Sequence, residues 1–294
     1  MDKPYIIFNP TAGSAGRRDD TRQRLKKLEP LAFRTTRRRG DAEKWARHAR
    51  AAKARVIVVA GGDGTLNEVV NGLHPLTPTM CIGLVPLGTG NDFARTMGLP
   101  FSIEENLEVL RFGKRTRIDV VLVKSKKTSR YFVNVSAGGF SGIVGEKMTR
   151  QIKRTWGPLA YVRGAAAALL DLHAYKTDIA LDDRERFSAE LYNVVVANGR
   201  FVAGGLPIAP TADPTDGKLE VVLIPKLGAA EMALLAAEIV LGKHLSSNAT
   251  IFRQARKIVV RSRSGMYFDV DGELVGTAPA TFQIIPRALN FIVK

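Results

Sequence analysis

Short apolar runs alternate with polar segments of helical length in the first part of the chain. The runs cover residues 5–8, 56–59 and 81–85, and a polar stretch over 41–54 precedes the second of them. Strands that are buried on both faces of a parallel sheet have this continuous apolar character, and helices usually connect them. The pattern therefore predicts βαβ units with a parallel sheet.

After about residue 118 the pattern changes to strands with longer separations between them. Two helical segments, near 142–172 and 229–241, interrupt these strands. Such a texture is typical of a second domain rich in antiparallel β-structure. The predicted strands cover residues 118–123, 131–135, 192–196, 219–224, 257–260, 267–270, 281–285 and 289–293.

The charge of the chain points to the kind of partner it binds. Its 44 Lys and Arg residues exceed its 28 Asp and Glu residues, which gives a formal net charge of +16. This excess favours a negatively charged partner such as a nucleotide, a nucleic acid or an anionic lipid. Ordinary solvated surface charge remains the alternative for most of these residues.

Cysteine usage and hydropathy favour a globular protein of the cytoplasm. Cys81 is the only cysteine, so no intrachain disulfide can form, and the start Met1-Asp-Lys-Pro has no features of a secretory leader. The best apolar run, 232–241, contains Glu238 and is shorter than the ~20 residues of a membrane span. The four histidines show no spacing suggestive of a zinc site.

A glycine- or asparagine-rich loop follows each of the first three apolar runs. These loops cover residues 9–13, 61–65 and 86–94. The carboxyl ends of parallel strands share one edge of a sheet, so the loops should meet there, although any one of them could be a simple turn. Glycines at 61, 62 and 64 would bring backbone amides close to an anion, and a helix starting near Leu66 would direct its dipole at that anion. Asp63 offers a carboxylate to a metal ion.

The loops match neither the Walker A motif nor the dinucleotide fingerprint. Gly-Gly-Asp-Gly-Thr at 61–65 is followed by Leu-Asn-Glu and, downstream, by Gly-Thr-Gly-Asn-Asp-Phe-Ala at 88–94. Together they resemble the signatures of the diacylglycerol kinase catalytic-domain family, in particular its bacterial soluble lipid kinases. The resemblance runs nearly end to end, with further matching segments at 36–42, 137–140, 213–219 and 270–274.

The resemblance implies an α/β fold followed by a β fold. An N-terminal α/β domain like that of NAD kinases and 6-phosphofructokinases would cover residues 1–122. An antiparallel β-sandwich domain would cover residues 123–294, with the last strand able to return to the first domain. ATP is expected between the two. By matching motifs, the nucleotide site would consist of Asn9, Pro10, Thr11, Ala12, Gly13, Thr36, Gly62, Asp63, Gly64, Thr65, Leu66, Asn67, Glu68 and Thr89.

The same resemblance implies the groups that carry phosphoryl transfer. Such a reaction needs a divalent metal and a group that takes the proton of the acceptor hydroxyl. Glu273 occupies the position of the family's proton acceptor, and Asp63 and Asp92 would organise the catalytic Mg²⁺. From the residues alone, Asp-Gly between Val270 and Leu274 favours an ordinary hairpin turn.

A second metal is implied at a loop of the second domain. Asp213, Asp216 and the backbone carbonyl of Lys218 would ligate it, in a structural role. Relatives often have a non-acidic residue at the position of Asp213, so the affinity for the metal could differ here. A metal-free Asx turn remains the alternative.

The predicted function is an ATP-dependent lipid kinase that acts on diacylglycerol or a related glycerolipid at an anionic membrane surface. NAD kinase shares Gly-Gly-Asp-Gly-Thr and is the second hypothesis, and a catalytically silent nucleotide-binding regulator is the third. No motif that reads nucleic acid is present. The basic amphipathic pattern over 143–156 fits either a membrane surface or packing on the sheet. The sequence leaves the acceptor lipid and homodimer formation open.

Overall fold

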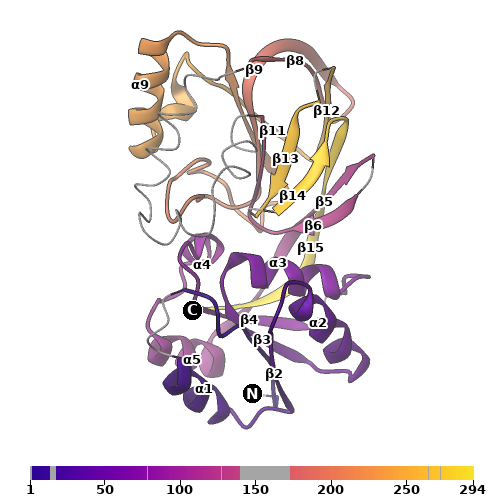
Figure 1. The fold of residues 1–294 in the computed structure, drawn as a ribbon, viewed down its shortest axis with the longest axis vertical. Coiled ribbons are helices and arrows are strands. Elements are labelled where there is room, and N and C mark those ends of the chain that lie inside the picture. Colours follow the sequence, from indigo (N-terminus) through magenta and orange to yellow (C-terminus); the bar gives the residue numbers. More distant parts are fainter. Residues whose placement is uncertain are drawn as a thin grey trace. The chain divides into compact units, whose positions relative to one another are not determined.

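A computed structural model describes residues 2–13, 18–77, 79–126, 128–139, 173–263, 265–271 and 273–294; of Glu273 it describes the main chain. These residues form two compact units. The first unit comprises Met1–Val120 and Pro286–Lys294, and the second comprises Val121–Ile285 (Figure 1). The predicted helical segment 142–172, with the amphipathic pattern over 143–156, lies outside the described residues.

A parallel sheet forms the centre of the first unit. Its strand order is β2 (Ala32–Thr35), β1 (Tyr5–Phe8), β3 (Val56–Gly61) and β4 (Cys81–Pro86), and each neighbouring pair is parallel. The end of β15 (Ala280–Val293) adds a further parallel strand, in which Asn290 pairs with Cys81. Every residue of β1, β3 and β4 is buried, which explains their unbroken apolar sequences.

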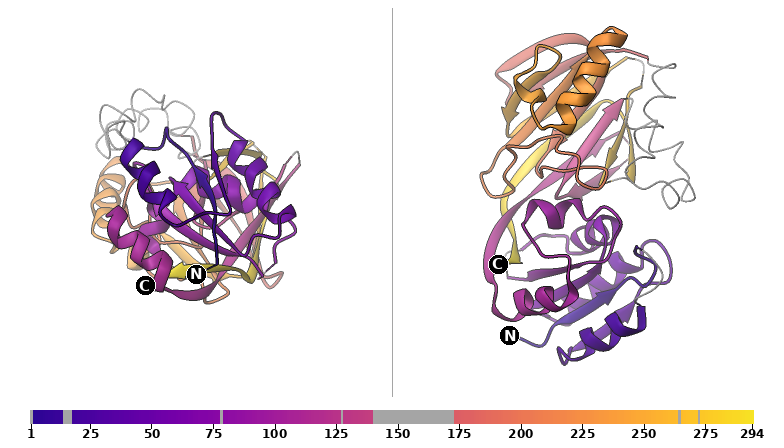
Figure 2. Two further views of the ribbon diagram at one scale, coloured as in Figure 1. Left: turned by 90° about the horizontal axis from the view of Figure 1, so that it is seen from below. Right: turned by 90° about the vertical axis from the view of Figure 1, so that its left-hand side faces the viewer.

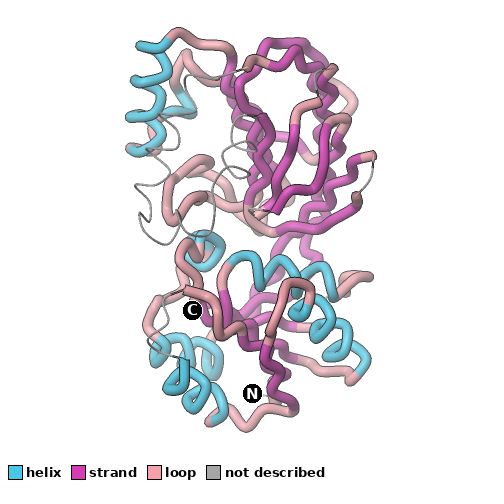
Figure 3. Tube along the Cα trace, in the orientation of Figure 1, coloured by secondary structure: helices cyan, strands magenta, loops and turns pink. Residues whose placement is uncertain are grey.

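Helices cover both faces of this sheet. The core around Ile6, Phe8 and Val58 is completed by Leu25 of α1 (Arg18–Lys26) and Leu110 of α5 (Ile103–Phe112). The helices α2 (Asp41–Ala51) and α3 (Asp63–Gly72) lie on the other side (Figures 1 and 3). The short helix α4 (Asp92–Thr96) follows the loop after β4.

The second unit is built from antiparallel strands. One sheet path runs in the order β14, β13, β7, β9, β8, β12 and β15, and β10 joins β9 to β11 (Figures 1 and 2). The strands β5 and β15 belong in part to each unit. The cluster of buried apolar residues at its centre includes Phe132, Phe268 and Phe282. The bounds are β5 (Lys114–Ser125), β6 (Ser129–Phe132), β7 (Val135–Gly139), β8 (Tyr175–Leu181), β9 (Glu185–Ala197), β10 (Leu219–Pro225), β11 (Ile251–Ala255), β12 (Lys257–Ser262), β13 (Tyr267–Val270) and β14 (Glu273–Thr277), with α9 (Ala229–Val240) and the 3₁₀ helix η3 (His244–Ser246).

The predicted fold class, α/β followed by antiparallel β, is confirmed, but several elements differ from the prediction. The predicted strand 131–135 is divided between β6 and β7, and the two predicted strands at the end of the chain form one strand, β15. The helix after the 61–65 loop begins at Asp63 rather than near Leu66. The strands β2, β8, β11 and β14 were not predicted.

Candidate functional site

The three loops that follow β1, β3 and β4 meet in the first unit, as predicted. The Asn9 Nδ2 donates a hydrogen bond to the Thr65 Oγ1 at 2.8 Å, which ties the first loop to the second. The Leu87 amide donates to the Gly61 carbonyl at 2.9 Å, which ties the third loop to the second. At Gly13, whose φ is +67°, a β-carbon would lie 2.2 Å from the Leu87 carbonyl oxygen. The first and third loops are therefore also in contact, and only glycine fits at position 13.

Two glycines bring the second and third loops into direct backbone contact. A β-carbon on Gly62 would lie 2.9 Å from the Gly88 Cα, and one on Gly88 would lie 2.6 Å from the Gly62 Cα. Both distances are shorter than the ~3.5 Å or more at which carbon atoms pack. The close approach therefore requires glycine at both positions.

The N-terminal end of α3 forms a cradle suited to an anion. Gly62 caps the helix, and its carbonyl accepts the amides of Thr65 and Leu66. The amides of Asp63 and Gly64 precede these and point out of the helix end. A β-carbon on Gly64 would have nothing within 4 Å, so open space lies beside these amides. This geometry fits a phosphate group.

Two carboxylates lie beside this cradle. The Asp63 Oδ2 accepts the Asp92 amide and the Asp63 Oδ1 accepts the Phe93 amide, each at 3.1 Å, so Asp63 caps α4. A β-carbon on Gly90 would lie 3.2 Å from the Asp92 Oδ2 and 3.3 Å from the Asp63 Oδ2. Asp63 and Asp92 thus face the same small volume. No group of three or more His, Cys, Asp or Glu side chains forms a metal site among the described residues. A pair of carboxylates with waters is nevertheless a set that Mg²⁺ accepts.

Several predicted nucleotide residues have other partners in the structure. The side chains of Leu66 and Asn67 are buried, and the Asn67 Oδ1 accepts the Asn71 amide group. The two Glu68 carboxylate oxygens accept the amides of Gly40 and Ala42, each at 3.0 Å, and so cap α2. A direct contact of these three side chains with a nucleotide stays a prediction.

The remaining predicted nucleotide residues lie at the carboxyl edge of the sheet. Thr36 is buried after β2, and Thr89 is exposed in the third loop. The Asn9 Oδ1 accepts hydrogen bonds from both the amide and the hydroxyl of Thr11. These bonds hold the first loop, which includes Pro10 and Ala12, in a turn. The loop after Thr36 is fixed by Asp41, whose carboxylate accepts the Arg37 amide; this hydrogen bond is the main reason why the pKa of Asp41 is lowered.

In the second unit, Glu273 begins β14 in a hairpin with β13. Val270 pairs with Glu273, and Asp271, whose φ is +48°, lies in the turn between the strands. The hairpin alternative for this segment is therefore confirmed. It is compatible with the predicted role of Glu273, which stays a prediction.

The predicted metal loop in the second unit contains two Asx turns. The Asp213 Oδ1 accepts the amide of Thr215 at 2.9 Å, and the Asp216 Oδ1 accepts the Lys218 amide at 2.8 Å. These bonds are those of the metal-free alternative. They leave the other oxygen of each carboxylate to further partners, so metal binding stays a prediction. Nearby, burial raises the pKa of Glu220, and Asp216 adds to the rise.

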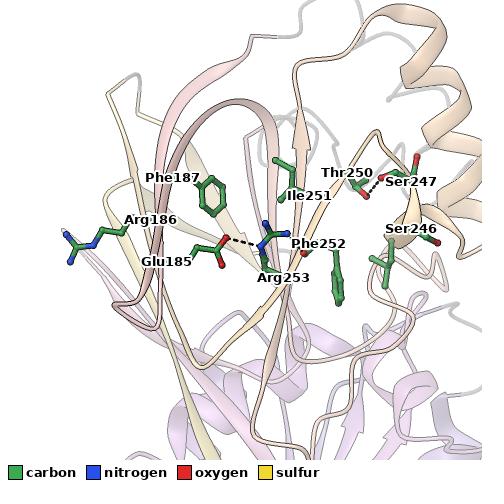
Figure 4. Close-up of a pocket in the computed structure, with 10 residues that line it drawn as sticks. Glu185, Arg186, Phe187, Ser246, Ser247, Thr250, Ile251, Phe252 and Arg253 are labelled. Carbon is green, nitrogen blue, oxygen red and sulfur yellow. Dashed lines mark hydrogen bonds and ion pairs between the residues drawn. The ribbon is translucent and has the colours of Figure 1, made fainter.

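A separate hollow of about 540 Å³ lies in the second unit (Figure 4). At its wall, the Arg253 Nε forms an ion pair with the Glu185 Oε1 at 2.9 Å. None of the predicted site residues is among those lining it: Glu185, Arg186, Phe187, Leu245, Ser246, Ser247, Thr250, Ile251, Phe252 and Arg253.

Comparison with known proteins identifies both halves of the chain. Residues 3–123 match the Diacylglycerol kinase catalytic domain, and residues 134–293 match the YegS C-terminal NAD kinase beta sandwich-like domain. A Staphylococcus saprophyticus protein named Diacylglycerol kinase is 33% identical over 94% of this chain and 90% of its own length. The chain belongs to the diacylglycerol kinase family.

Further relatives of this chain support its place in the diacylglycerol kinase family. The Bacillus subtilis protein named Diacylglycerol kinase is 30% identical over 100% of this chain and 97% of its own length. A crystal structure from Bacillus anthracis, described only provisionally as a diacylglycerol kinase, has a TM-score of 0.84 and 25% identity, and the match covers 100% of this chain and 95% of that one. Within the part of the chain that the structure describes, no helix is long and apolar enough to cross a membrane.

Sequence reasoning missed three residues that shape the site of this family member. Gly88 and Gly90 make the close approaches described above. The Asn91 side chain accepts the Gly88 amide at 2.8 Å and donates to the Gly88 carbonyl at 2.7 Å, and its φ of +52° turns the chain into α4. Asparagine tolerates this conformation better than most residues, so an Asn directly before a short helix was the available signal.

Proposed function

We propose that this chain is an ATP-dependent lipid kinase that transfers the γ-phosphoryl group to a hydroxyl of diacylglycerol or a related glycerolipid. The observation that carries the proposal is the contact of three glycine-bearing loops around the N-terminus of α3, beside the carboxylates of Asp63 and Asp92. Membership in the diacylglycerol kinase family supports the lipid acceptor.

The first unit would bind the nucleotide. The amides of Asp63 and Gly64 would donate to phosphate oxygens, because α3 leaves them without acceptors of its own. The Thr89 hydroxyl is a further donor on the third loop, whereas the Thr11 hydroxyl already donates to the Asn9 Oδ1. Asn9 would act indirectly, since it holds Thr11 and Thr65 in place.

Asp63 and Asp92 would hold Mg²⁺, which supplies charge neutralisation at the transferred phosphoryl group. Asp63 already accepts two backbone amides. We therefore assign Asp63 a contact through water.

Glu273 would be the general base. As the acceptor oxygen bonds to the γ-phosphorus and the bond to the leaving ADP oxygen breaks, the hydroxyl proton passes to the Glu273 carboxylate.

Asp213, Asp216 and the Lys218 carbonyl would hold a structural metal in the second unit. The net charge of +16 would favour peripheral binding to an anionic membrane, at about 1 kcal/mol per well-placed Lys or Arg.

NAD kinase activity is the second candidate, because the second half of the chain matches a domain described as NAD kinase beta sandwich-like. A nucleotide-binding regulator without turnover is the third. Both alternatives predict ATP binding, so binding alone does not separate the three.

A panel of acceptors separates them. The purified protein is incubated with γ-labelled ATP and Mg²⁺ and with anionic vesicles containing diacylglycerol, phosphatidylglycerol, a sphingoid base or a polyprenol, with NAD in a parallel reaction. We expect label in the diacylglycerol product. Label in NADP alone would support the NAD kinase alternative, and ATP binding without any transfer would support the regulator.

A further inference from the structure

We infer that Asp271 is the positioning residue for Glu273, because it anchors the β13–β14 hairpin to β7 through its side chain. The inference rests on the proposed function, in which Glu273 is the general base. In addition, it assigns to Asp271 the role of holding the main chain of Glu273 in place.

The anchor is a pair of hydrogen bonds between Asp271 and Val135. The Asp271 amide donates to the Val135 carbonyl at 3.0 Å, and the Val135 amide donates to the Asp271 Oδ1 at 3.1 Å. An antiparallel ladder would use the main-chain carbonyl of residue 271 as the second acceptor. At Asp271, whose φ of +48° departs from that of a strand, the side-chain carboxylate accepts this bond instead.

The anchored turn lies next to Glu273 in the sheet. Val270 of β13 pairs with Glu273 on one side and with Ser136 of β7 on the other. The Ser136 Oγ donates to the Asp269 carbonyl at 2.6 Å, which adds a second bond between β13 and β7. The main chain of Glu273 is thus connected to β7 through one intervening strand and through the Asp271 turn.

Position 271 has two requirements, and they can be tested separately. The left-handed backbone favours Gly, Asn or Asp, and the bond to Val135 needs an acceptor oxygen two bonds beyond the β-carbon, as in Asp or Asn. Asp271→Asn keeps both features. Asp271→Gly keeps only the backbone freedom, and Asp271→Ala keeps neither.

A matched control exists in the same unit. Asp182, whose φ is +51°, lies in the turn between β8 and β9. Its Oδ1 accepts the amides of Arg256 and Lys257, each at 2.8 Å. Asp182→Gly therefore removes two such side-chain bonds from a similar turn in a hairpin that does not carry Glu273.

The experiment measures kcat, the KM for ATP, the pH profile and the melting temperature with diacylglycerol in anionic vesicles. For Asp271→Gly and Asp271→Ala we expect kcat to fall about 100-fold at an unchanged KM for ATP, the size of effect that a ~1 Å misplacement of a catalytic group causes. For Asp271→Asn and Asp182→Gly we expect turnover within about threefold of the wild type. The pH profile of Asp271→Asn should be that of the wild type, and hydrogen exchange at the Val135 amide should accelerate only in the Gly and Ala variants.

Four results would overturn the inference. Full turnover of Asp271→Gly would show that the anchor is dispensable. Loss of turnover in Asp271→Asn, or loss of one limb of its pH profile, would show that the carboxylate acts through its charge. An equal loss in Asp182→Gly would show a general effect of weakened hairpins. No transfer by the wild type would remove the proposed function and this inference together, whereas the first three results leave the proposed function intact.

Discussion

Replacing Gly88 by alanine should separate the two loops that form the proposed phosphate site. The added β-carbon would lie 2.6 Å from the Gly62 Cα and 2.8 Å from the Asn91 Oδ1. Gly62 is main chain, and the Asn91 side chain is held by the amide and the carbonyl of residue 88 itself, so neither neighbour can turn aside.

The magnitude follows from these distances. Carbon atoms pack at about 3.5–4.0 Å, so the loops must move apart by about 1 Å. Overpacking of this kind costs about 1–3 kcal/mol of stability. If the amides at the start of α3 hold the phosphates, a displacement of that size should lower kcat/KM for ATP about 100-fold.

The assay combines thermal unfolding, ATP affinity by calorimetry and turnover. Gly228→Ala is the matched control, because the nearest atom to its added β-carbon is the Glu231 Oε2 at 3.4 Å, an ordinary contact. A Gly88→Ala variant that unfolds like the wild type and binds ATP within threefold of it would refute the reasoning.

Four further predictions can be checked on single variants or on the wild type. Gly64→Ala should raise stability by about 0.5–1 kcal/mol through helix propensity but lower ATP affinity at least tenfold, since its side chain enters the space beside the amides; unchanged affinity would place the phosphates elsewhere. Asp63→Ala should lower the free energy of unfolding by about 0.5–2 kcal/mol in metal-free buffer, because α4 loses its cap; an unchanged melting curve would contradict the capping role. Glu273→Gln should lower kcat at least 100-fold while calorimetry shows unchanged ATP affinity, and retained turnover would exclude Glu273 as the base. Burial raises the pKa of the Cys81 thiol to about 11, so this thiol should resist alkylation at pH 9 in the folded protein. The free energy of unfolding should fall between about pH 9 and 11, because only the unfolded state releases the thiol proton in that range. Rapid alkylation of the folded protein at pH 9 would contradict this prediction.

The strands predicted most accurately from the sequence are those in which every residue is buried. All residues of β1, β3 and β4 are buried, so an apolar run was enough to find them. β2 is partly exposed and includes Arg34, and its short sequence carries no clear period. Two strands were predicted on either side of Pro286 and Arg287, yet β15 continues through these residues, with Arg287 at a φ of +53°.

The meeting of the three loops could be predicted because it follows from parallel topology alone. The partners of individual side chains could not, since they depend on residues far away in the sequence. Glu68 looked like a ligand residue of the motif, but it accepts amides 26 and 28 residues earlier in the chain. Gly88 belongs to the 88–94 motif, but the sequence does not show that it approaches Gly62, which lies on another loop.

We propose above that this chain transfers the γ-phosphoryl group of ATP to a lipid hydroxyl. The most direct test is the initial rate at which label from γ-labelled ATP enters the organic phase, with diacylglycerol in anionic mixed micelles and Mg²⁺. We expect label in phosphatidic acid that depends on both diacylglycerol and protein. Protein that binds ATP under these conditions but labels no lipid, or labels only NAD, would contradict it.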